Sequence, residues 1–353
     1  MTMQTTTEEK ESSLNHGPTR AGEFVSVVIP CYNEERFILK ALENLANQYE
    51  NSHYEIIVVD GGSTDGTRDV VKQFREANPD LQITLVDNPA RHIPTALNLG
   101  VAAARGGIIA RMDAHAVPSS GYIRRCVEVL KQSDAGVVGM PCHVLPGADT
   151  LLAHAIARGV SHPFGIGDAK YRLQAGAAQQ EDVDTVAFAC FRKSLWADLG
   201  GFNESLLTNE DYDFNYRVRT TGRNVLLDRS EHCDYFARTG FRELAAQYRR
   251  YGSWKARMIR LHPGSTRLRH LVAPGFVLSL VLLIFLSIVW HPIGVVLGLE
   301  VGLYLVLSLW FSWQIGRQNG ASVAMVPMMP LVFMTIHLSW GTSFLIGLVR
   351  PPK

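Results

Sequence analysis

A carboxylate and an imidazole stand two residues apart in the segment Arg111-Met-Asp-Ala-His-Ala116, directly after the apolar run Gly107-Ile-Ile-Ala110. We expect this run to be a short buried strand, so that Asp113 and His115 emerge at its carboxyl end. Side chains two apart on an extended segment point to the same side. Together they would suit a divalent cation that carries phosphate oxygens. Taken alone, a D-x-H pattern is weak, because a polar strand end with a hydrogen-bonded histidine is more common.

The segments around this pair alternate between predicted strands and predicted helices. Such alternation predicts right-handed βαβ units and a mostly parallel, Rossmann-like α/β sheet. Ligands of such sheets bind at the carboxyl ends of the strands, where Pro30, Asp60 and Asp113 all fall. The predicted strands cover residues 23–30, 54–59, 81–86, 107–113, 135–140, 183–191 and 224–227, and the predicted helices cover 34–48, 67–77, 95–104, 119–131 and 209–219. Asn33 is the expected cap of the first helix. Residues 141–185 show no clear pattern, and within them 162–167 and 173–180 are expected to be irregular loop.

The C-terminal part of the chain has the composition of a membrane region. Three apolar segments, 272–290, 293–313 and 325–349, each reach the roughly 20 residues that span hydrocarbon. They follow nine Arg and Lys residues between Arg238 and Arg269, against the single acid Glu243. The positive-inside rule makes this segment a cytoplasmic membrane flank rather than a nucleic-acid site. Three spans are favoured, although two prolines near the third segment also allow a re-entrant course.

The compartment follows from the cysteines and the N-terminus. The five cysteines form no CxxC pair and no zinc spacing, which indicates free thiols in a reducing compartment. The first twenty residues are polar and lack the apolar region of a signal peptide. We therefore expect a multi-pass protein of the inner (cytoplasmic) membrane with its N-terminal part in the cytosol.

Six motifs, in this order, resemble those of the family-two glycosyltransferases: IPCYNE, VVDGGSTDGT, NPARHIPTALNLG, MDAHA, GGFNESLLTNEDYDFNYR and QYRRYG. Within that family, MDAHA, NEDYDFNYR and QYRRYGSWK are most similar to bacterial succinoglycan-type exopolysaccharide glucosyltransferases. The resemblance implies the GT-A nucleotide-diphospho-sugar transferase fold. With the composition, it divides the chain into a disordered tail (1–22), a cytosolic GT-A catalytic domain (23–240), a basic amphipathic interfacial helix with a linker (241–270) and a transmembrane region (271–353).

The resemblance also implies a donor site. Tyr32 and Glu34, which follow the strand ending at Pro30, would hold the uridine of a UDP-sugar. Asp60 would accept the imide N–H of uracil. Arg91 would grip a phosphate or the nucleobase face.

Asp113 and His115 correspond to the DxD element of the family, with His in place of the second Asp. An imidazole is a softer ligand than a carboxylate, which favours Mn²⁺ over Mg²⁺. The metal would offset the charge on the departing UDP. It stays open whether His115 binds the metal or only a phosphate.

The acceptor side is implied in the same way. Asp211 would be the base that takes the proton of the acceptor hydroxyl, and Glu210 would orient the acceptor. Gln247, Arg250 and Tyr251 resemble the QxxRW element, in which the arginine would clamp the diphosphate and the aromatic ring would flank the acceptor sugar.

The function implied is inverting transfer of one hexose, glucose by resemblance, from UDP to a polyprenyl-diphosphate-linked oligosaccharide in exopolysaccharide biosynthesis. The QxxRW element is typical of processive polysaccharide synthases, which remain an alternative, especially if several copies or other polysaccharide-assembly proteins form a channel. A non-catalytic membrane module that binds nucleotide-sugar or glycolipid is the alternative outside the enzymes.

Overall fold

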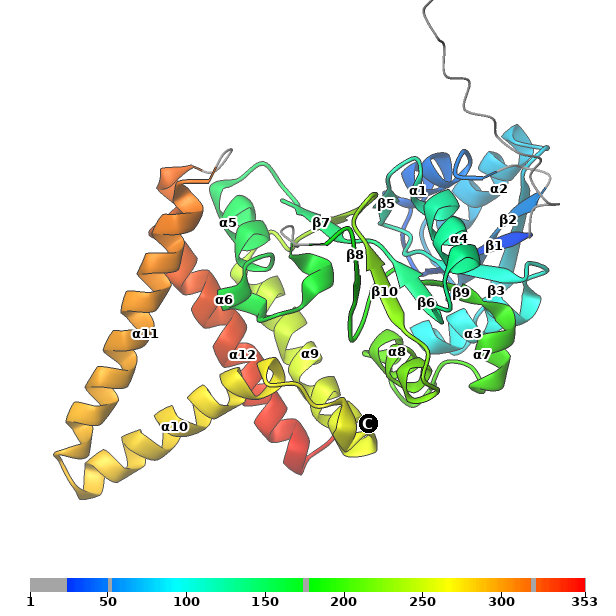
Figure 1. The fold of residues 1–353 in the computed structure, drawn as a ribbon. Coiled ribbons are helices and arrows are strands. Elements are labelled where there is room, and N and C mark those ends of the chain that lie inside the picture. The colour runs from blue at the N-terminus through cyan, green and yellow to red at the C-terminus, as the bar shows by residue number, and fades with distance from the viewer. Residues whose placement is uncertain (1–23, 50–52, 174–177, 319–321, 353) are drawn as a thin grey trace, which may run out of the picture.

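A computed structural model describes residues 24–49, 53–173, 178–318 and 322–352. Its largest element is an eight-stranded sheet in the order β3-β2-β1-β4-β9-β6-β10-β8 (Figure 1). Strands β1 to β4 run parallel, whereas β9 and β8 run antiparallel to their neighbours. The strands are β1 (Val25–Cys31), β2 (Tyr54–Asp60), β3 (Gln82–Asp87), β4 (Ile108–Arg111), β6 (Val137–Gly139), β8 (Gln180–Asp182), β9 (Cys190–Arg192) and β10 (Val225–Asp228).

Helices cover both faces of this sheet, which explains why β1 and β2 are apolar and buried almost throughout. One face packs against α1 (Ile38–Leu45), α2 (Thr67–Ala77) and α4 (Tyr122–Gln132). The other face packs against α3 (Ile93–Ala103), α7 (Lys193–Asp198) and α8 (Glu210–Thr220). The chain leaves β1 toward β2 and β3 and returns on its other side with β4, so the strand order reverses beside β1. Ligands of open α/β sheets bind at this place.

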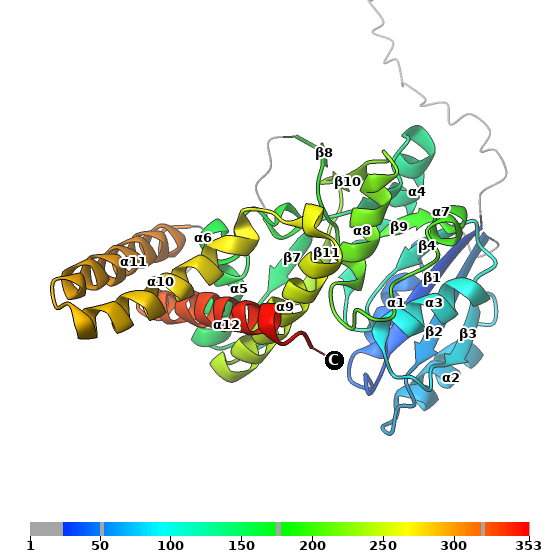
Figure 2. The same cartoon turned by 90° about the horizontal axis from the view of Figure 1, so that it is seen from below.

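A second, three-stranded sheet lies between the large sheet and the C-terminal helices (Figure 2). In it, β11 (Cys233–Phe236) runs antiparallel to β5 (Val117–Pro118) and parallel to β7 (Cys142–Leu145). Because β5 follows β4 closely, this sheet connects the end of the parallel strands to the rest of the chain.

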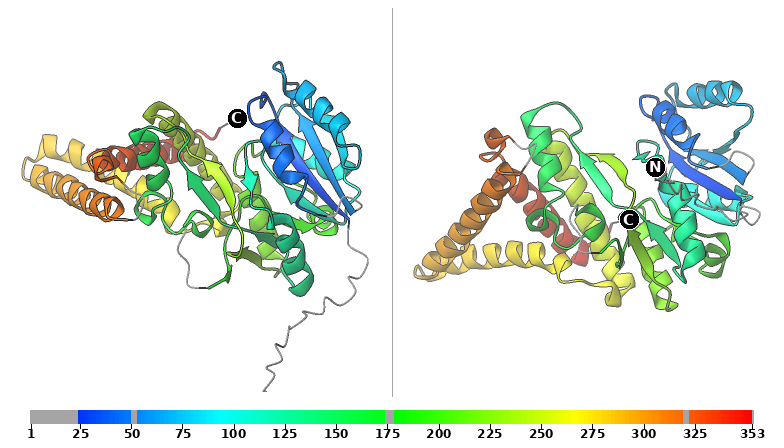
Figure 3. Two further views of the ribbon diagram at one scale, coloured as in Figure 1. Left: turned by 90° about the horizontal axis from the view of Figure 1, so that it is seen from above. Right: turned by 45° about the horizontal axis from the view of Figure 1, so that its top comes forward.

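Four long helices form the C-terminal part: α9 (Phe241–Leu261), α10 (Arg269–Val289), α11 (Ile293–Gly316) and α12 (Met329–Val349). Helix α12 packs along α9, while α10 and α11 splay away from the sheets (Figures 1 and 3). Small residues allow the α9–α12 contact, because a Cβ at Gly252 would lie 2.5 Å from the Trp340 carbonyl oxygen. Helices α10, α11 and α12 are each long and apolar enough to cross a membrane.

Several predictions of local structure are confirmed, and their bounds differ little from the observed ones. The helix predicted at 67–77 is α2, and the predicted basic helix coincides with α9. The third apolar helix begins at Met329 rather than at 325, with a proline in its first turn. The tail predicted for residues 1–22 lies outside the described residues.

Three predictions are wrong, each for a reason outside the local sequence. The predicted strand 183–191 is interrupted between β8 and β9, where Phe188 has φ 47° and side chains bond to α8 instead. The first helix begins at Ile38, because the Asn33 side chain accepts the backbone N–H of Thr64 rather than capping a helix. The loop predicted at 162–167 contains the short helix α6 (Pro163–Ile166). Like β7 and α5 (Leu151–Gly159), for which the sequence shows no clear pattern, it packs in one cluster with α12, far along the chain.

Candidate functional site

The carboxyl end of β2 is an ordered turn built on Asp60. The Asp60 side chain is fully buried and accepts from Ser63 Oγ (2.5 Å), from the backbone N–H groups of Gly62 and Ser63 (3.1 Å each) and from Arg68 Nη1 (2.8 Å). Gly62 has φ 75°, which a residue without Cβ adopts at no steric cost. In this structure Asp60 therefore orders the turn. Its predicted contact with uracil stays a prediction and requires one of these partners to be exchanged.

Tyr32 and Arg91 lie together above this turn. Pro30 pairs with Val59 one residue before the end of β1, and the half-exposed Tyr32 ring packs against Gly61. The Arg91 guanidinium carbon lies 5.7 Å from the centre of the Tyr32 ring. An exposed aromatic face beside a guanidinium can stack a nucleobase and bind a phosphate.

Asp113 and His115 follow β4, on the other side of β1. Asp113 Oδ1 accepts from Arg111 Nη2 at 3.1 Å, and His115 Nδ1 lies 3.2 Å from Glu34 Oε1. This hydrogen bond raises the pKa of His115 against the effect of burial. The structure thus places Glu34 beside the imidazole, in addition to its predicted uridine role. Metal-ligating histidines often bond a carboxylate through the second ring nitrogen, so this arrangement fits a metal ligand at Nε2.

Arg111 joins three carboxylates at the centre of the site. Its guanidinium lies 3.1 Å from Asp113, 3.4 Å from Glu210 and 3.7 Å from Asp211. Burial alone would lower the pKa of Arg111, but these carboxylates more than offset it and the pKa is raised. Arg111 therefore neutralises part of the negative charge that Asp113 and Asp211 would otherwise carry unpaired.

Glu210 and Asp211 begin α8 but differ in environment. Asn209, with φ 69°, turns the chain into the helix, and acidic residues are favoured in this first turn. Glu210 is only 5% exposed, and burial together with Asp211 raises its pKa to about 8. The Asp211 side chain is 35% exposed. Of the two carboxyl groups, that of Asp211 is the more accessible, which fits its predicted role as the base.

The three residues from α9 form an aromatic wall. The Gln247 amide donates to the hydroxyl groups of Tyr235 (2.9 Å) and Tyr251 (3.1 Å), so it fixes both rings. The exposed Arg250 guanidinium lies over Tyr251, 5.7 Å from the ring centre. Gln247 thus positions the wall, whereas Arg250 and Tyr251 line the adjoining cavity.

This cavity, of about 590 Å³, links the carboxylates to the membrane-type helices. Asp113, Glu210 and Asp211 line it at the sheet, and residues of α10, α11 and α12 line it at the far side: Val272, Ala273, Phe276, Tyr304, Ile336, His337 and Trp340. The volume lies within the range of about 300–1,000 Å³ that is typical of small-molecule sites.

Comparison with known proteins identifies the origin of this arrangement. Residues 26–200 match the profile of glycosyl transferase family 2. The chain belongs to this family. The chain of this family-2 glycosyltransferase is 28% identical to the succinoglycan biosynthesis protein ExoA of Rhizobium meliloti, over 90% of this chain and 93% of that protein.

Two further relatives bear on the fold and the family. A dolichyl N-acetyl-α-D-glucosaminyl phosphate 3-β-D-2,3-diacetamido-2,3-dideoxy-β-D-glucuronosyltransferase of Methanococcus voltae is 28% identical over 67% of this chain and 74% of its own. The mannosyltransferase PcManGT of Pyrobaculum calidifontis, solved with GDP-Man and Mn²⁺, superposes with a TM-score of 0.61 at 20% identity, over 90% of this chain and 87% of that one. The structural similarity to PcManGT confirms the predicted GT-A fold, which is followed here by three long apolar helices.

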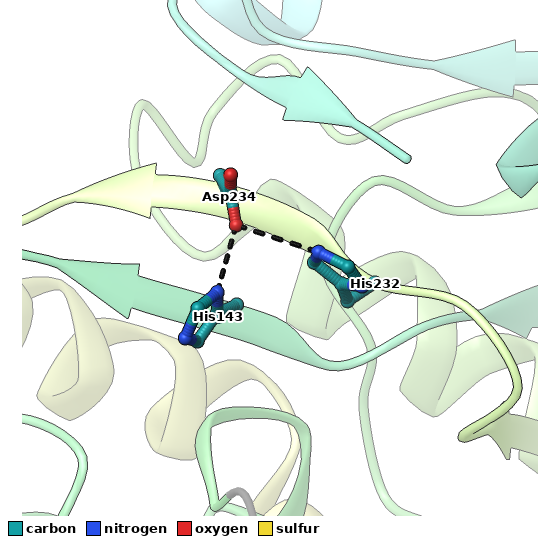
Figure 4. Close-up of side chains that lie close together, drawn as sticks. All are labelled: His143, His232 and Asp234. Atoms are coloured by element: carbon teal, nitrogen blue, oxygen red, sulfur yellow. Dashed lines mark hydrogen bonds and ion pairs between the residues drawn. The ribbon is translucent and has the colours of Figure 1, made fainter. Parts of the chain in front are cut away.

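The family-2 glycosyltransferase carries a second group of metal-type ligands, which the sequence prediction missed. His143 Nδ1 and His232 Nε2 lie 2.9 Å and 3.6 Å from Asp234 Oδ1 (Figure 4). Within the described part of the chain this is the one group of three His, Cys, Asp or Glu side chains close enough to hold one ion. Cys142 and Tyr235 line the cavity, so strand alternation places His143 and Asp234 on the opposite face of the small sheet. The H-x-D spacing of His232 and Asp234 is the signal that could have found it.

Sequence reasoning also missed Arg172 and Lys255, which line the same cavity in this family-2 glycosyltransferase. Lys255 belongs to the basic run that the sequence assigned to a membrane flank, whereas its side chain is buried. Arg172 lies within 141–185, where the sequence shows no clear pattern. No local pattern marks either residue, because their partners come from distant segments.

Proposed function

We propose that this chain transfers a hexose, glucose, from a UDP-sugar to a polyprenyl-diphosphate-linked oligosaccharide at the cytosolic face of the inner membrane, in exopolysaccharide biosynthesis. The observation that carries the proposal is the cavity that joins Asp211 to the membrane-type helices. A soluble acceptor would not need a binding cavity walled by such helices. The relation to a succinoglycan biosynthesis protein over nearly the whole chain supports the same class of acceptor.

In the proposed reaction, Asp211 takes the proton of the acceptor hydroxyl as its oxygen attacks the anomeric carbon. Attack from the face opposite UDP inverts that carbon, so an α-linked donor gives a β-linkage. Glu210, which its raised pKa keeps largely protonated at neutral pH, would orient the acceptor as a hydrogen-bond donor. Arg111, which lies 3.7 Å from Asp211, would hold this carboxylate in place.

Asp113 and His115 would hold Mn²⁺ or Mg²⁺, which supplies Lewis-acid stabilisation of the leaving diphosphate when bound. The structure supports this assignment through the donor set itself. Asp113 uses one carboxylate oxygen toward Arg111, and His115 uses Nδ1 toward Glu34, which leaves one ligand atom on each. Tyr32, Arg91 and the turn at Asp60 would bind the uridine and its phosphates beside them.

The α9 helix and the three apolar helices would hold the site at the membrane surface. The basic residues of α9 place the catalytic part on the cytosolic side by the positive-inside rule. We further propose the division inferred above, with residues 23–240 as the catalytic domain, 241–270 as the interfacial segment and 271–353 as the membrane region.

Purified full-length protein, incubated with UDP-glucose, Mn²⁺ and a lipid extract from cells that lack it, tests the proposal. We expect label from the sugar to enter the lipid fraction, with the glycolipid gaining one hexose by mass spectrometry. Products that carry many hexoses would instead indicate a processive synthase. Absence of both transfer and UDP release would contradict an enzymatic function.

A further inference from the structure

Two cations in the cavity lack the acidic partners that such groups usually have. Lys255 is 3% exposed, and its Nζ lies 3.1 Å from the centre of the Tyr212 ring. The Arg172 guanidinium lies 5.6 Å and 5.4 Å from the ring centres of Tyr171 and Tyr235, and its Nε is buried without a hydrogen-bond partner. Among the described residues, no carboxylate lies within 4.0 Å of either cation.

Two other cations that line the cavity, Arg111 and Arg269, are paired with acids, whereas the exposed Arg250 forms no ion pair with a described carboxylate. Arg111 contacts three carboxylates, and Arg269 contacts Asp168 at 2.8 Å and also Asp184. Burying an unpaired charge is unfavourable, so side chains that remain so usually bind a ligand or lose the charge. Burial, with Arg269 adding to it, does lower the pKa of Lys255 to about 7, against Asp211 and Asp184. An anion bound beside Lys255 or beside Arg172 would stabilise the charge of that side chain.

The position of the two cations indicates which anion they would meet. They share a cavity with Asp211 on one side and with Phe276, Ile336 and Trp340 of the membrane-type helices on the other. Tyrosine rings, which pack well against sugar faces, surround Arg172. A ligand that fills this cavity would therefore present a hydroxyl to Asp211, a phosphate to the cations and an apolar chain to the helices.

We propose that Lys255 and Arg172 bind the phosphate of the lipid-linked acceptor, and that the sugar that is glycosylated is the first or second from that phosphate. The inference rests on the proposed function, since it assumes a lipid acceptor at this site. It also limits the number of sugars between the phosphate and the reacting hydroxyl. A cavity of about 590 Å³ admits a phosphate and one or two sugar rings but not a long glycan. Arginine and lysine are both suited to phosphate oxygens.

The donor diphosphate has the same chemistry as the acceptor phosphate, so the experiment must separate the two. Full-length protein in phosphatidylcholine nanodiscs is titrated with farnesyl diphosphate, with the uncharged farnesol and, separately, with UDP and Mn²⁺. We expect farnesyl diphosphate to bind more tightly than farnesol and to bind equally well when UDP is saturating. Competition between UDP and farnesyl diphosphate would overturn the proposal without any variant.

Variants then assign the phosphate to the two side chains. Lys255→Met and Arg172→Gln should each weaken farnesyl diphosphate binding by about tenfold or more while leaving UDP affinity unchanged. Arg249→Gln, on an exposed arginine of the same helix, is the charge-matched control and should bind as the wild type does. Retained UDP binding shows that each variant is folded.

Unchanged farnesyl diphosphate affinity in both variants would overturn the proposal, as would parallel loss of UDP affinity, which would assign the cations to the donor. Failure of the proposed function gives a different result, because the wild type would then not bind UDP or transfer sugar to any lipid fraction.

Discussion

The two ends of the cavity differ in whether their cations are paired with acids. At the sheet, Arg111 is paired with Asp113, Glu210 and Asp211, and the Asp60 carboxylate is met by Arg68, a hydroxyl and two backbone N–H groups. At the membrane side, Lys255 is buried and Arg172 is half-buried against tyrosine rings, and no carboxylate of the described residues lies within 4.0 Å of either. The cation at the first end is thus paired within the protein, whereas the proposed acceptor phosphate would pair these two cations at the second.

This difference teaches how the two substrates would be held. A site whose charges are already paired keeps its geometry before any substrate arrives, which suits residues that must align a leaving group and a base. Cations that are left unpaired have a strong preference for a phosphate but contribute little to folding. Substitutions at the two ends should therefore act on different properties.

The largest effect is expected at the base. Asp211→Asn should reduce sugar transfer by about 10²–10⁴-fold, because the acceptor hydroxyl loses its proton acceptor. UDP affinity should not change, since Asp211 faces the acceptor. Transfer is measured by UDP release, and affinity by calorimetry with Mn²⁺. Asp69→Asn, on an exposed side chain of α2, is the control. A loss of UDP affinity in Asp211→Asn would show that this carboxylate serves the donor instead.

The next largest effect is on the free energy of unfolding, which should respond to a substitution at the sheet end of the cavity. Arg111→Met should destabilise the fold by about 3–5 kcal/mol, because it leaves carboxylates close together without their cation. Thermal unfolding of the detergent-solubilised protein measures the change in stability. Lys72→Met, which removes only an exposed ion pair, should change stability by no more than about 0.5 kcal/mol.

Metal dependence distinguishes the two groups of possible ligands, on opposite faces of the small sheet. Asp113→Ala should weaken Mn²⁺-dependent UDP binding by about 10–100-fold. His143→Gln should leave it unchanged, because His143 points away from the cavity. If His143→Gln weakened UDP binding and Asp113→Ala did not, the donor metal would be assigned to the group of His143, His232 and Asp234.

The parallel half of the fold could be predicted from sequence because its signals are local. Strands β1 and β2 are apolar apart from Ser26, Glu55 and Asp60, and the bounds of α2 and α9 follow from helical periodicity. The region from β7 to α6 could not be predicted, since its short helices are stabilised by α12, nearly two hundred residues later in the chain. Residues 183–189 have a strand-like composition but are diverted by side-chain bonds to α8.

The candidate site divides in the same way. Asp113, Glu210 and Asp211 were predicted from motifs, and the structure brings all three onto Arg111, although their roles remain predictions. Lys255 and Arg172 could not be found from sequence, because what marks them is the absence of a nearby acid. That property depends on every segment that surrounds the cavity.

The smallest effect concerns Lys255 and tests directly whether the cation at the membrane side of the cavity is unpaired. Its pKa of about 7 in the folded protein lies far below the 10.5 of an exposed lysine, so the unfolded chain binds the proton more tightly. Stability is therefore lost as the pH falls from about 10 to 7, and Lys255→Met should remove this loss. The Tyr212 ring faces the amine, and Arg269, Asp211 and Asp184 act on its pKa, but none of these residues is changed. We expect the variant to unfold roughly 2–4 °C above the wild type at pH 7, with the difference vanishing near pH 10.

A variant that unfolds well below the wild type at pH 7 would mean that groups inside the protein already stabilise the Lys255 ammonium. The contrast between the two ends of the cavity would then be wrong.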